Sequence, residues 1–174
     1  LNALMTSFIG QGAKIDLQPR PDPEALLRAI DDQDAEVFAG VPALFTQMFR
    51  VYRDDPDAYD LSSLEYVVCA AAPLAEDVRK TIQEEWDVVM IEGWGMTETS
   101  PAGTIEPVAG VQKEAGSVGP PVPGLELKIV DPETREVRLD RDDIEPFPDP
   151  DIDFEDDEVV TGELAVRGDP VFEG

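Results

Sequence analysis

Histidine is absent from this chain of 174 residues, and its absence removes several kinds of catalytic chemistry. Without histidine, neither a Ser-His-Asp arrangement nor a histidine-ligated zinc site can be built from these residues. The single cysteine, Cys69, excludes an intrachain disulfide and a cysteine-rich metal site, which fits a reducing compartment. Cys69 ends an apolar run and has no basic neighbour in sequence, so we expect a small buried hydrophobe rather than a reactive thiol.

Long apolar runs are missing as well. No segment approaches the ~20 apolar residues of a membrane span, and no signal peptide is visible, so we expect a cytoplasmic protein without a transmembrane segment. Hydrophobic residues still make up 42% of the chain, and this share is enough to build a core.

Basic side chains are few relative to acidic ones. Lys and Arg number 13 against 39 Asp and Glu, which gives a net charge of -26. Such self-repulsion destabilises a compact state at low ionic strength. Salt near 1 M shortens the Debye length to ~3 Å and removes most of this penalty. We therefore expect a halophilic protein of a high-salt cytoplasm, with neither nucleic acid nor an anionic membrane as a partner.

The most informative segment is Glu92–Thr99, which reads Glu-Gly-Trp-Gly-Met-Thr-Glu-Thr. The apolar residues before it, Val88–Ile91, predict a strand covered on both faces in a parallel sheet. Gly93 and Gly95 break this pattern, so we expect the chain to leave the sheet there in a loop. Ligands of open α/β sheets bind beyond the carboxyl ends of the strands, where this loop would lie.

The side chains of this segment suit a nucleotide and its metal ion. Trp94 offers a flat π face to a base, Thr97 a hydroxyl to a phosphate oxygen, and Glu98 a hard oxygen ligand to Mg²⁺. The plainer alternative is a glycine-containing turn with a packed Trp and a solvated Glu. Glu92 is open to two interpretations: it reaches an adenine amino group, or it ends the strand at a solvated surface.

Four segments in this order resemble the adenylate-forming superfamily, and within it the acyl-CoA synthetases, or fatty-acid–CoA ligases. These segments are Cys69–Leu74, Gly93–Glu98, Gly116–Gly119 and Thr161–Gly168. The resemblance runs over nearly the whole chain. It implies an α/β fold at 1–104, with a parallel sheet flanked by helices, followed at 105–174 by a β-rich, barrel-like subdomain.

The resemblance also implies a site. Its nucleotide-binding residues would be Ala71, Ala72, Pro73, Glu92, Gly93, Trp94, Gly95, Met96 and Thr97, with Thr97 and Glu98 catalytic and Glu98 the metal ligand. In the family the first segment usually reads Gly-Gly-Ala-Pro and packs on the adenine opposite the aromatic ring. Here Ala70 and Ala71 stand where the glycines would be, which bears on any backbone geometry that needs positive φ. The plainer alternative is a helix N-terminus with Pro73 in its first turn.

The implied reaction joins a carboxylic acid, which we expect to be a fatty acid, to CoA. ATP and Mg²⁺ would activate the acid as acyl-AMP with release of pyrophosphate, and the CoA thiol would then displace AMP. The family's phosphate loop, ribose-binding aspartate and C-terminal lid with its lysine are not found in these residues. We therefore expect the central part of a larger enzyme, inactive without the remainder, which as an isolated piece dimerises or binds nucleotide weakly. Another adenylating ligase, for aryl or amino acids, and a non-catalytic nucleotide-binding or structural remnant stay open as alternatives.

Along residues 1–104, alternating patterns predict parallel strands joined by right-handed helical crossovers. Helices are predicted at 1–9, from Asp22-Pro23, from Pro42 and at 74–86, and strands at 14–17, 37–39, 66–69 and 88–91. Later strands are predicted at 125–130, 137–139 and 163–166, the first two as a hairpin. Residues 140–158 are dominated by acidic side chains. We interpret them as a solvated insertion rather than a calcium loop, because Phe154 and Val160 stand where an EF-hand needs glycine and glutamate.

Overall fold

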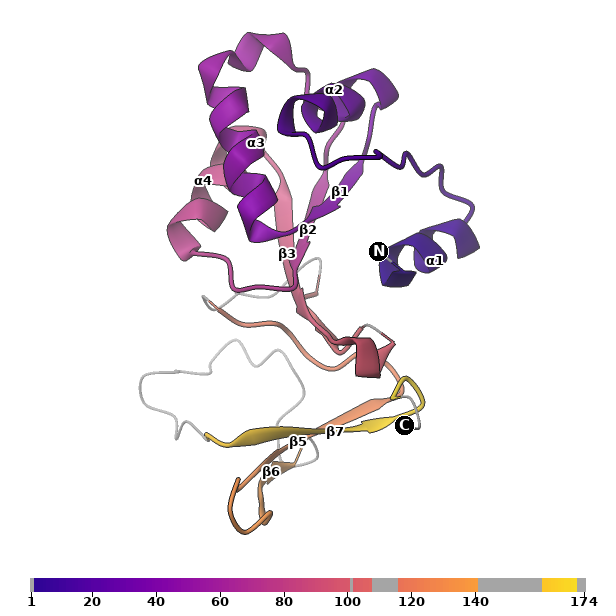
Figure 1. The fold of residues 1–174 in the computed structure, drawn as a ribbon, viewed down its shortest axis with the longest axis vertical. Coiled ribbons are helices and arrows are strands. Elements are labelled where there is room, and N and C mark those ends of the chain that lie inside the picture. Colours follow the sequence, from indigo (N-terminus) through magenta and orange to yellow (C-terminus); the bar gives the residue numbers. More distant parts are fainter. Residues whose placement is uncertain (1, 101, 108–115, 141–160, 172–174) are drawn as a thin grey trace.

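The computed structural model describes residues 2–100, 102–107, 116–140 and 161–171, and it contains two sheets (Figure 1). The first sheet has the strand order β1-β2-β3-β4, and the second has the order β6-β5-β7. Helices cover the first sheet, while the second lies below it in the view of Figure 1. This arrangement confirms the expected α/β fold with a parallel sheet.

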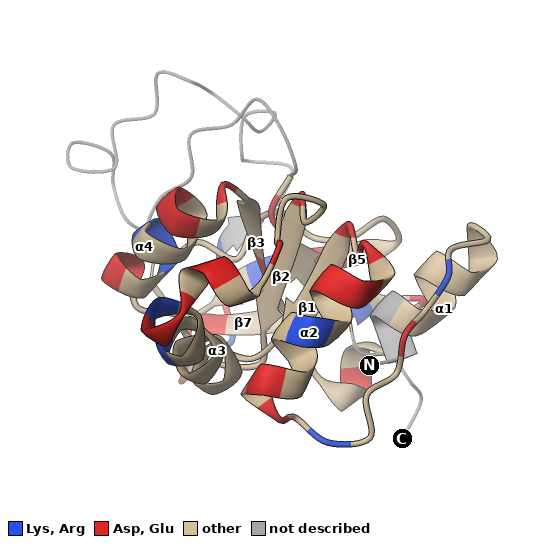
Figure 2. Cartoon of the chain, turned by 90° about the horizontal axis from the view of Figure 1, so that it is seen from above, with Lys and Arg blue, Asp and Glu red and all other residues tan. Residues whose placement is uncertain are grey.

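The first sheet is formed by β1 (Val37–Gly40), β2 (Tyr66–Ala70), β3 (Val89–Trp94) and β4 (Thr104–Ile105). Strands β1, β2 and β3 are parallel, and β4 runs antiparallel to β3. The helices are α1 (Asn2–Gly10), α2 (Pro23–Gln33), α3 (Pro42–Asp54) and α4 (Glu76–Trp86). Helices α2 to α4 gather beside the sheet, whereas α1 lies apart from them (Figures 1 and 2). The predicted alternation of helices and strands is therefore largely confirmed.

The core lies between the sheet and the helices α2, α3 and α4. Its fully buried side chains come from the apolar stripes of the helices and from alternate positions of β2 and β3. They include Leu27, Phe45, Met48, Val67, Ile82 and Met90. The sequence also determines where α2 begins, because the Asp22 carboxylate accepts a hydrogen bond from the Ala25 amide at 2.9 Å and Pro23 follows the cap.

Three local expectations were wrong in whole or in part. Lys14–Leu17 is not a strand: it pairs with no other strand in the described ranges, although β1 lies at the edge of the first sheet and pairs there with β2 alone. Val89 in β3 is 39% exposed, so coverage of this strand on both faces fails at its first residue, whereas Met90 and Ile91, which point to opposite faces, are 0% and 5% exposed. Helix α4 begins at Glu76, later than the predicted residue 74, because Ala71–Ala75 form the turn that follows β2.

The second sheet consists of β5 (Leu125–Val130), β6 (Val137–Asp140) and β7 (Glu163–Gly168), all antiparallel to their neighbours. In the turn between β5 and β6, the Asp131 carboxylate accepts hydrogen bonds from the amides of Glu133 and Thr134 at 2.8 and 2.9 Å. These bonds, with Arg138, lower the pKa of Asp131 to about 2. The predicted hairpin is confirmed, and the closure of this region into a barrel stays a prediction.

The acidic segment predicted as an insertion lies, from residue 141 on, outside the described residues. Elsewhere, acidic residues recur along the helices α2 and α4, whereas the one acidic residue of α3 is Asp54 at its end (Figure 2). Within the described ranges, none of the helices combines the length and apolar composition that crossing a membrane requires.

Candidate active site

Two segments of the predicted site leave neighbouring parallel strands at the same edge of the first sheet. Ala70, the last residue of β2, pairs with Gly93 in β3. Ala71–Pro73 therefore begins beside the point where Gly93 and Trp94 end β3. Ala71–Pro73 is exposed, and Trp94 is half-buried. The structure thus brings together the two segments that sequence reasoning placed on opposite sides of one ligand.

Ala71 has the backbone conformation of a glycine. Its φ is 74°, in the left-handed region, although its side chain is a methyl group. An L-residue pays about 1–2 kcal/mol for this conformation, so the tertiary structure must hold it. Pro73 precedes α4 by three positions, because Ala75 is the residue before the helix and Glu76 its first. The alternative of a helix N-terminus with Pro73 in its first turn is therefore wrong.

Gly93 lies inside strand β3 rather than in a loop, which corrects the predicted exit from the sheet. It pairs with Ala70 on one side and with Ile105 of β4 on the other. A Cβ atom at this position would lie 3.0 Å from the carbonyl oxygen of Thr104. The glycine is required by the close approach of β4, and the chain leaves the sheet only after Trp94.

The indole of Trp94 lies directly against the backbone of Gly103. The Gly103 amide donates a hydrogen bond to the Trp94 carbonyl at 2.9 Å. A Cβ atom on Gly103 would come within 2.5 Å of the ring atoms Cε3 and Cζ3 of Trp94. Gly103 therefore determines where this aromatic ring can lie, a role that sequence reasoning missed.

After Trp94 the chain turns through the short 3-10 helix η2 (Thr97–Thr99). The Thr99 hydroxyl accepts a hydrogen bond from the Met96 amide at 3.1 Å and donates one to the Met96 carbonyl at 3.0 Å. Thr99 is 2% exposed, and its buried hydroxyl stabilises this turn through these two hydrogen bonds. Thr97 and Glu98 are exposed beside it, and Glu98 makes no hydrogen bond or ion pair within the described ranges.

One carboxylate on this turn is a suitable partner for Mg²⁺ that arrives with a nucleotide. Mg²⁺ keeps several waters and is usually bound through one or two carboxylates together with substrate phosphates. No group of three or more acidic or cysteine side chains that could hold a metal ion by itself occurs in the described part of the chain. A single carboxylate such as that of Glu98 is the kind of ligand that a Mg²⁺ site shared with phosphate oxygens uses.

Glu92 lies in a buried ionic cluster with Arg79 and Glu106. Arg79 Nη1 donates to Glu92 Oε1 at 2.6 Å, and Arg79 Nη2 donates to Glu106 Oε2 at 2.9 Å. The three side chains are 5%, 9% and 2% exposed, in the order Arg79, Glu92, Glu106. Burial raises the pKa of Glu92, an effect that Arg79 opposes and Glu106 increases.

This cluster corrects one interpretation of Glu92 and weakens the other. The strand does not end at a solvated surface there, because Glu92 is 7% exposed and interior to β3. Contact with an adenine amino group stays a prediction, although the carboxylate already accepts a hydrogen bond from Arg79. One sequence signal pointed to Arg79: it lies three and seven residues before Ile82 and Trp86, on the apolar stripe of α4.

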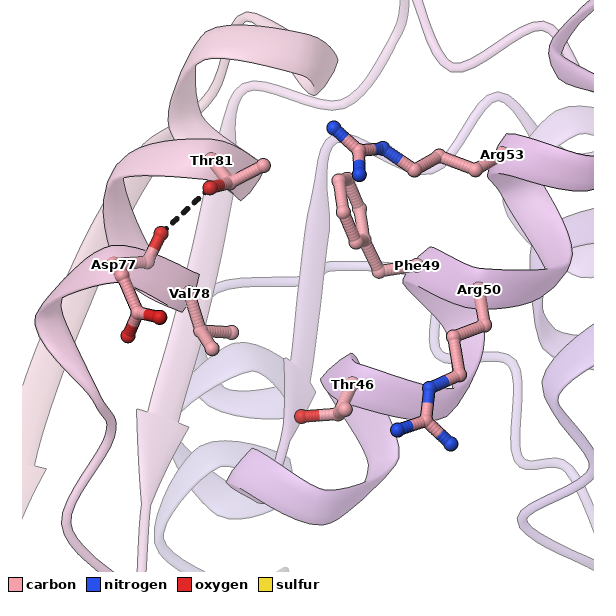
Figure 3. Close-up of a pocket in the computed structure, with 7 residues that line it drawn as sticks. All are labelled: Thr46, Phe49, Arg50, Arg53, Asp77, Val78 and Thr81. Carbon is pink, nitrogen blue, oxygen red and sulfur yellow. Dashed lines mark hydrogen bonds between the residues drawn. The ribbon is translucent and has the colours of Figure 1, made fainter.

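A separate groove of about 300 Å³ lies between α3 and α4 (Figure 3). It is lined by Thr46, Phe49, Arg50, Arg53, Asp77, Val78 and Thr81. In it Arg53 lies over the Phe49 ring, 4.6 Å from its centroid, and the Thr81 hydroxyl donates to the Asp77 carbonyl at 2.6 Å. None of the predicted site residues lines this groove, so the site is better defined by the two exposed segments at the strand ends.

Cys69 is 1% exposed in the core, and burial raises the pKa of its thiol to about 12. The expectation of a small buried hydrophobe is therefore confirmed.

Comparison with known proteins identifies the class. A family model described as AMP-binding enzyme matches residues 2–174, and the chain belongs to that family. Among curated relatives, 4-coumarate–CoA ligase 2 of Oryza sativa subsp. japonica is 28% identical over all of this chain and 28% of the relative. The long-chain-fatty-acid–CoA ligase of Bacillus subtilis (strain 168) is 29% identical over 79% of this chain and 24% of the relative.

A solved structure agrees in fold. ATP-bound MatB from Rhodopseudomonas palustris aligns with a TM-score of 0.68 at 28% identity, over 91% of this chain and 27% of that chain. The chain therefore spans between 24% and 28% of the length of these relatives. These comparisons confirm the resemblance to adenylate-forming CoA ligases.

Proposed function

We propose that this chain is the central part of an ATP-dependent acyl-CoA synthetase that activates a carboxylic acid, a fatty acid in the first instance. The observation that carries the proposal is the juxtaposition of Ala71–Pro73 and Trp94 at neighbouring strand ends, in a chain that belongs to the AMP-binding enzymes. Relatives named as CoA ligases and an ATP-bound relative support ATP and CoA as co-substrates.

In this proposal each exposed group has one task. The indole of Trp94 stacks on the adenine, and Ala71, Ala72 and Pro73 form the opposite wall. The backbone of Gly95 and Met96 lies beside the nucleotide. The Thr97 hydroxyl donates a hydrogen bond to an α-phosphate oxygen. We leave Glu92 out of this set because its carboxylate is bound to Arg79.

Glu98, in this proposal, holds Mg²⁺ together with the nucleotide phosphates. The bound ion would neutralise phosphate charge during attack on the α-phosphorus. The protein's own contribution is to hold the carboxylate of the acid in line with that phosphorus, because such positioning lowers the barrier. The CoA thiol then displaces AMP from the acyl-adenylate.

Acid-dependent ATP–pyrophosphate exchange by the full-length gene product tests the reaction. A long-chain fatty acid and 4-coumarate should be compared, because a coumarate ligase matches the whole chain and makes an aryl acid the second candidate. Exchange with the fatty acid alone supports the first proposal, and exchange with coumarate alone supports the second. Exchange with neither acid, nor with amino acids, would leave a non-catalytic remnant.

Replacement of Glu98 by glutamine tests the metal role. We expect the variant to require more Mg²⁺ for exchange, since one hard oxygen ligand is lost. Glu133→Gln, at an exposed position of the β5–β6 turn, is the matched control. An unchanged Mg²⁺ requirement in Glu98→Gln would contradict the assignment.

We further propose a halophilic protein of a high-salt cytoplasm that, as the isolated chain, dimerises or binds nucleotide weakly. The net charge of -26 supports the first part, and the partly exposed apolar side chain of Val89 in β3 supports the second. Thermal melting in low and in molar KCl tests salt dependence, and an unchanged melting temperature would refute it. Sedimentation at both salt concentrations reports the association state.

A further inference from the structure

The ionic cluster of Arg79, Glu92 and Glu106 joins a helix to two neighbouring segments of the first sheet. Arg79 belongs to α4, Glu92 to β3, and Glu106 directly follows β4. Arg79 donates to both carboxylates and, at 3.2 Å, to the carbonyl of Met90. A single guanidinium thus holds a helix, the strand that carries Trp94, and the short strand beside it.

The cluster also fixes the register between β3 and β4. The Glu92 amide donates to Glu106 Oε2 at 2.7 Å, and the Glu106 amide donates to the Glu92 carbonyl at 2.9 Å. Glu106 therefore contacts Glu92 through both its side chain and its backbone. Any shift of Glu106 along the strand would break both contacts.

This register determines the position of the Trp94 ring. Thr104 pairs with Trp94, and the backbone of Gly103 lies against the indole. Gly103 is three residues from Glu106, and the two residues between them pair with Gly93 and Trp94, so a displacement of Glu106 would be transmitted along β4 to the ring. The two glutamates and the arginine are all at most 9% exposed, so bringing these strands together through them costs the desolvation of three charged groups. Well-packed apolar side chains of similar volume would often serve equally well or better for stability.

We propose that Arg79, Glu92 and Glu106 are positioning residues, which set β4 and hence the indole of Trp94 for stacking on the adenine. The inference rests on the proposed function for its ligand, but the placement of the ring does not. In this role Glu92 acts through the strand register and not by contact with the nucleotide.

The test uses the chain carrying Trp86→Phe, so that Trp94 is the remaining tryptophan of the two. Glu106→Gln removes one charge from the cluster and keeps the shape of the side chain. We expect a red-shifted Trp94 emission and greater acrylamide quenching without any nucleotide, at unchanged far-ultraviolet circular dichroism. The affinity of the full-length gene product for Mg²⁺–ATP should fall by about tenfold, which corresponds to the loss of about 1.4 kcal/mol of base–aromatic stacking.

Matched variants separate the possible outcomes. Glu126→Gln removes a carboxylate of the exposed pair with Arg167 and should leave Trp94 unchanged. Glu92→Gln should reproduce the emission shift that Glu106→Gln shows without nucleotide. If Glu92 instead contacted the adenine directly, Glu92→Gln alone would lose affinity for Mg²⁺–ATP, and its emission without nucleotide would be unchanged. That second pattern overturns the proposal, as does unchanged emission in Glu106→Gln.

Two further results keep the proposal and the function distinguishable. If Glu106→Gln unfolds, Arg79→Lys tests the same dependence of Trp94 emission on the cluster, because lysine keeps the positive charge but lacks the forked guanidinium that binds both carboxylates. An intermediate Trp94 shift in Arg79→Lys supports the positioning role, and wild-type emission opposes it. If the full-length gene product binds no Mg²⁺–ATP while the ligand-free shifts occur, the ring is positioned as proposed and the nucleotide function fails.

Discussion

Replacement of Arg79 by methionine removes the only cation of the buried cluster while filling most of its volume. The variant leaves the carboxylates of Glu92 and Glu106 facing each other behind α4. Both are buried, at 9% and 2% exposed, so water cannot replace the lost guanidinium without opening the structure.

The expected loss of stability follows from this burial. Removing one partner of a buried ion pair costs about 3–5 kcal/mol, because an uncompensated charge remains inside. For a chain of this length, such a loss lowers the melting temperature by about 6–20 °C. It is a large share of the ~5–15 kcal/mol that separates a native domain from its unfolded state.

The loss should depend on pH in a defined direction. The pKa of Glu92 is already raised above its usual value by burial, and Arg79 is the neighbour that opposes this rise. In the variant the folded-state pKa rises further. A carboxyl whose pKa is raised on folding contributes stability below its unfolded pKa, and this contribution disappears as pH increases through the folded value. The difference between variant and wild type should therefore be largest near neutrality and shrink as the pH is lowered towards the usual carboxyl range.

Urea denaturation in molar KCl, followed by circular dichroism at several pH values, measures this difference. Arg135→Met is the matched control, since Arg135 pairs with Glu163 at an exposed site, with side chains 65% and 49% exposed. Its expected cost is at most about 1 kcal/mol, with little change over the same pH range. If Arg79→Met costs no more than Arg135→Met, or if its cost grows as the pH falls, the cluster does not have the energetic role argued from its burial.

Three other changes test local geometry. Ala71→Gly should raise the free energy of unfolding by about 0.5–1 kcal/mol, because glycine adopts the φ of 74° without strain. The control Ala72→Gly should lower it by a similar amount, and equal effects of the two changes in urea melts would contradict this reasoning. Gly103→Ala should shift tryptophan emission and lower the free energy of unfolding by about 1–3 kcal/mol, since its Cβ would lie 2.5 Å from the indole. The control Gly10→Ala places its Cβ in free space and should change the free energy of unfolding by no more than about 0.5 kcal/mol. The Cys69 thiol should resist a disulfide reagent at pH 8 in the native chain and react fully in urea; native labelling at the unfolded rate would show that the core is open at this position.

Local patterns predicted most of the elements of the first sheet. Asp22 and Pro23 placed the start of α2, and the apolar spacing of α3 identified the buried face that contains Phe45 and Met48. These signals are local, because caps and helical periodicity depend on residues a few positions apart. The strand predicted at Lys14–Leu17 failed for the complementary reason: a strand needs a partner, and no local pattern states whether a partner exists.

The same division holds for the candidate site. The segment from Gly93 to Glu98 could be recognised from residue types and order, together with Ala71–Pro73. The roles of Gly93 and Glu92 could not, since they depend on β4 and on Arg79, which lie 11 and 13 residues away from them in sequence.

By itself, the sequence determined the family, the chemistry available at the nucleotide loop, and the classes of site that a chain without histidine cannot build. Only the tertiary structure decided that Ala71 keeps a glycine conformation, that Gly93 belongs to the strand, and that Glu92 is bound inside the protein. The physical reason is that residue type limits which interactions a side chain can make, whereas burial and neighbours brought together by folding select which of them it makes.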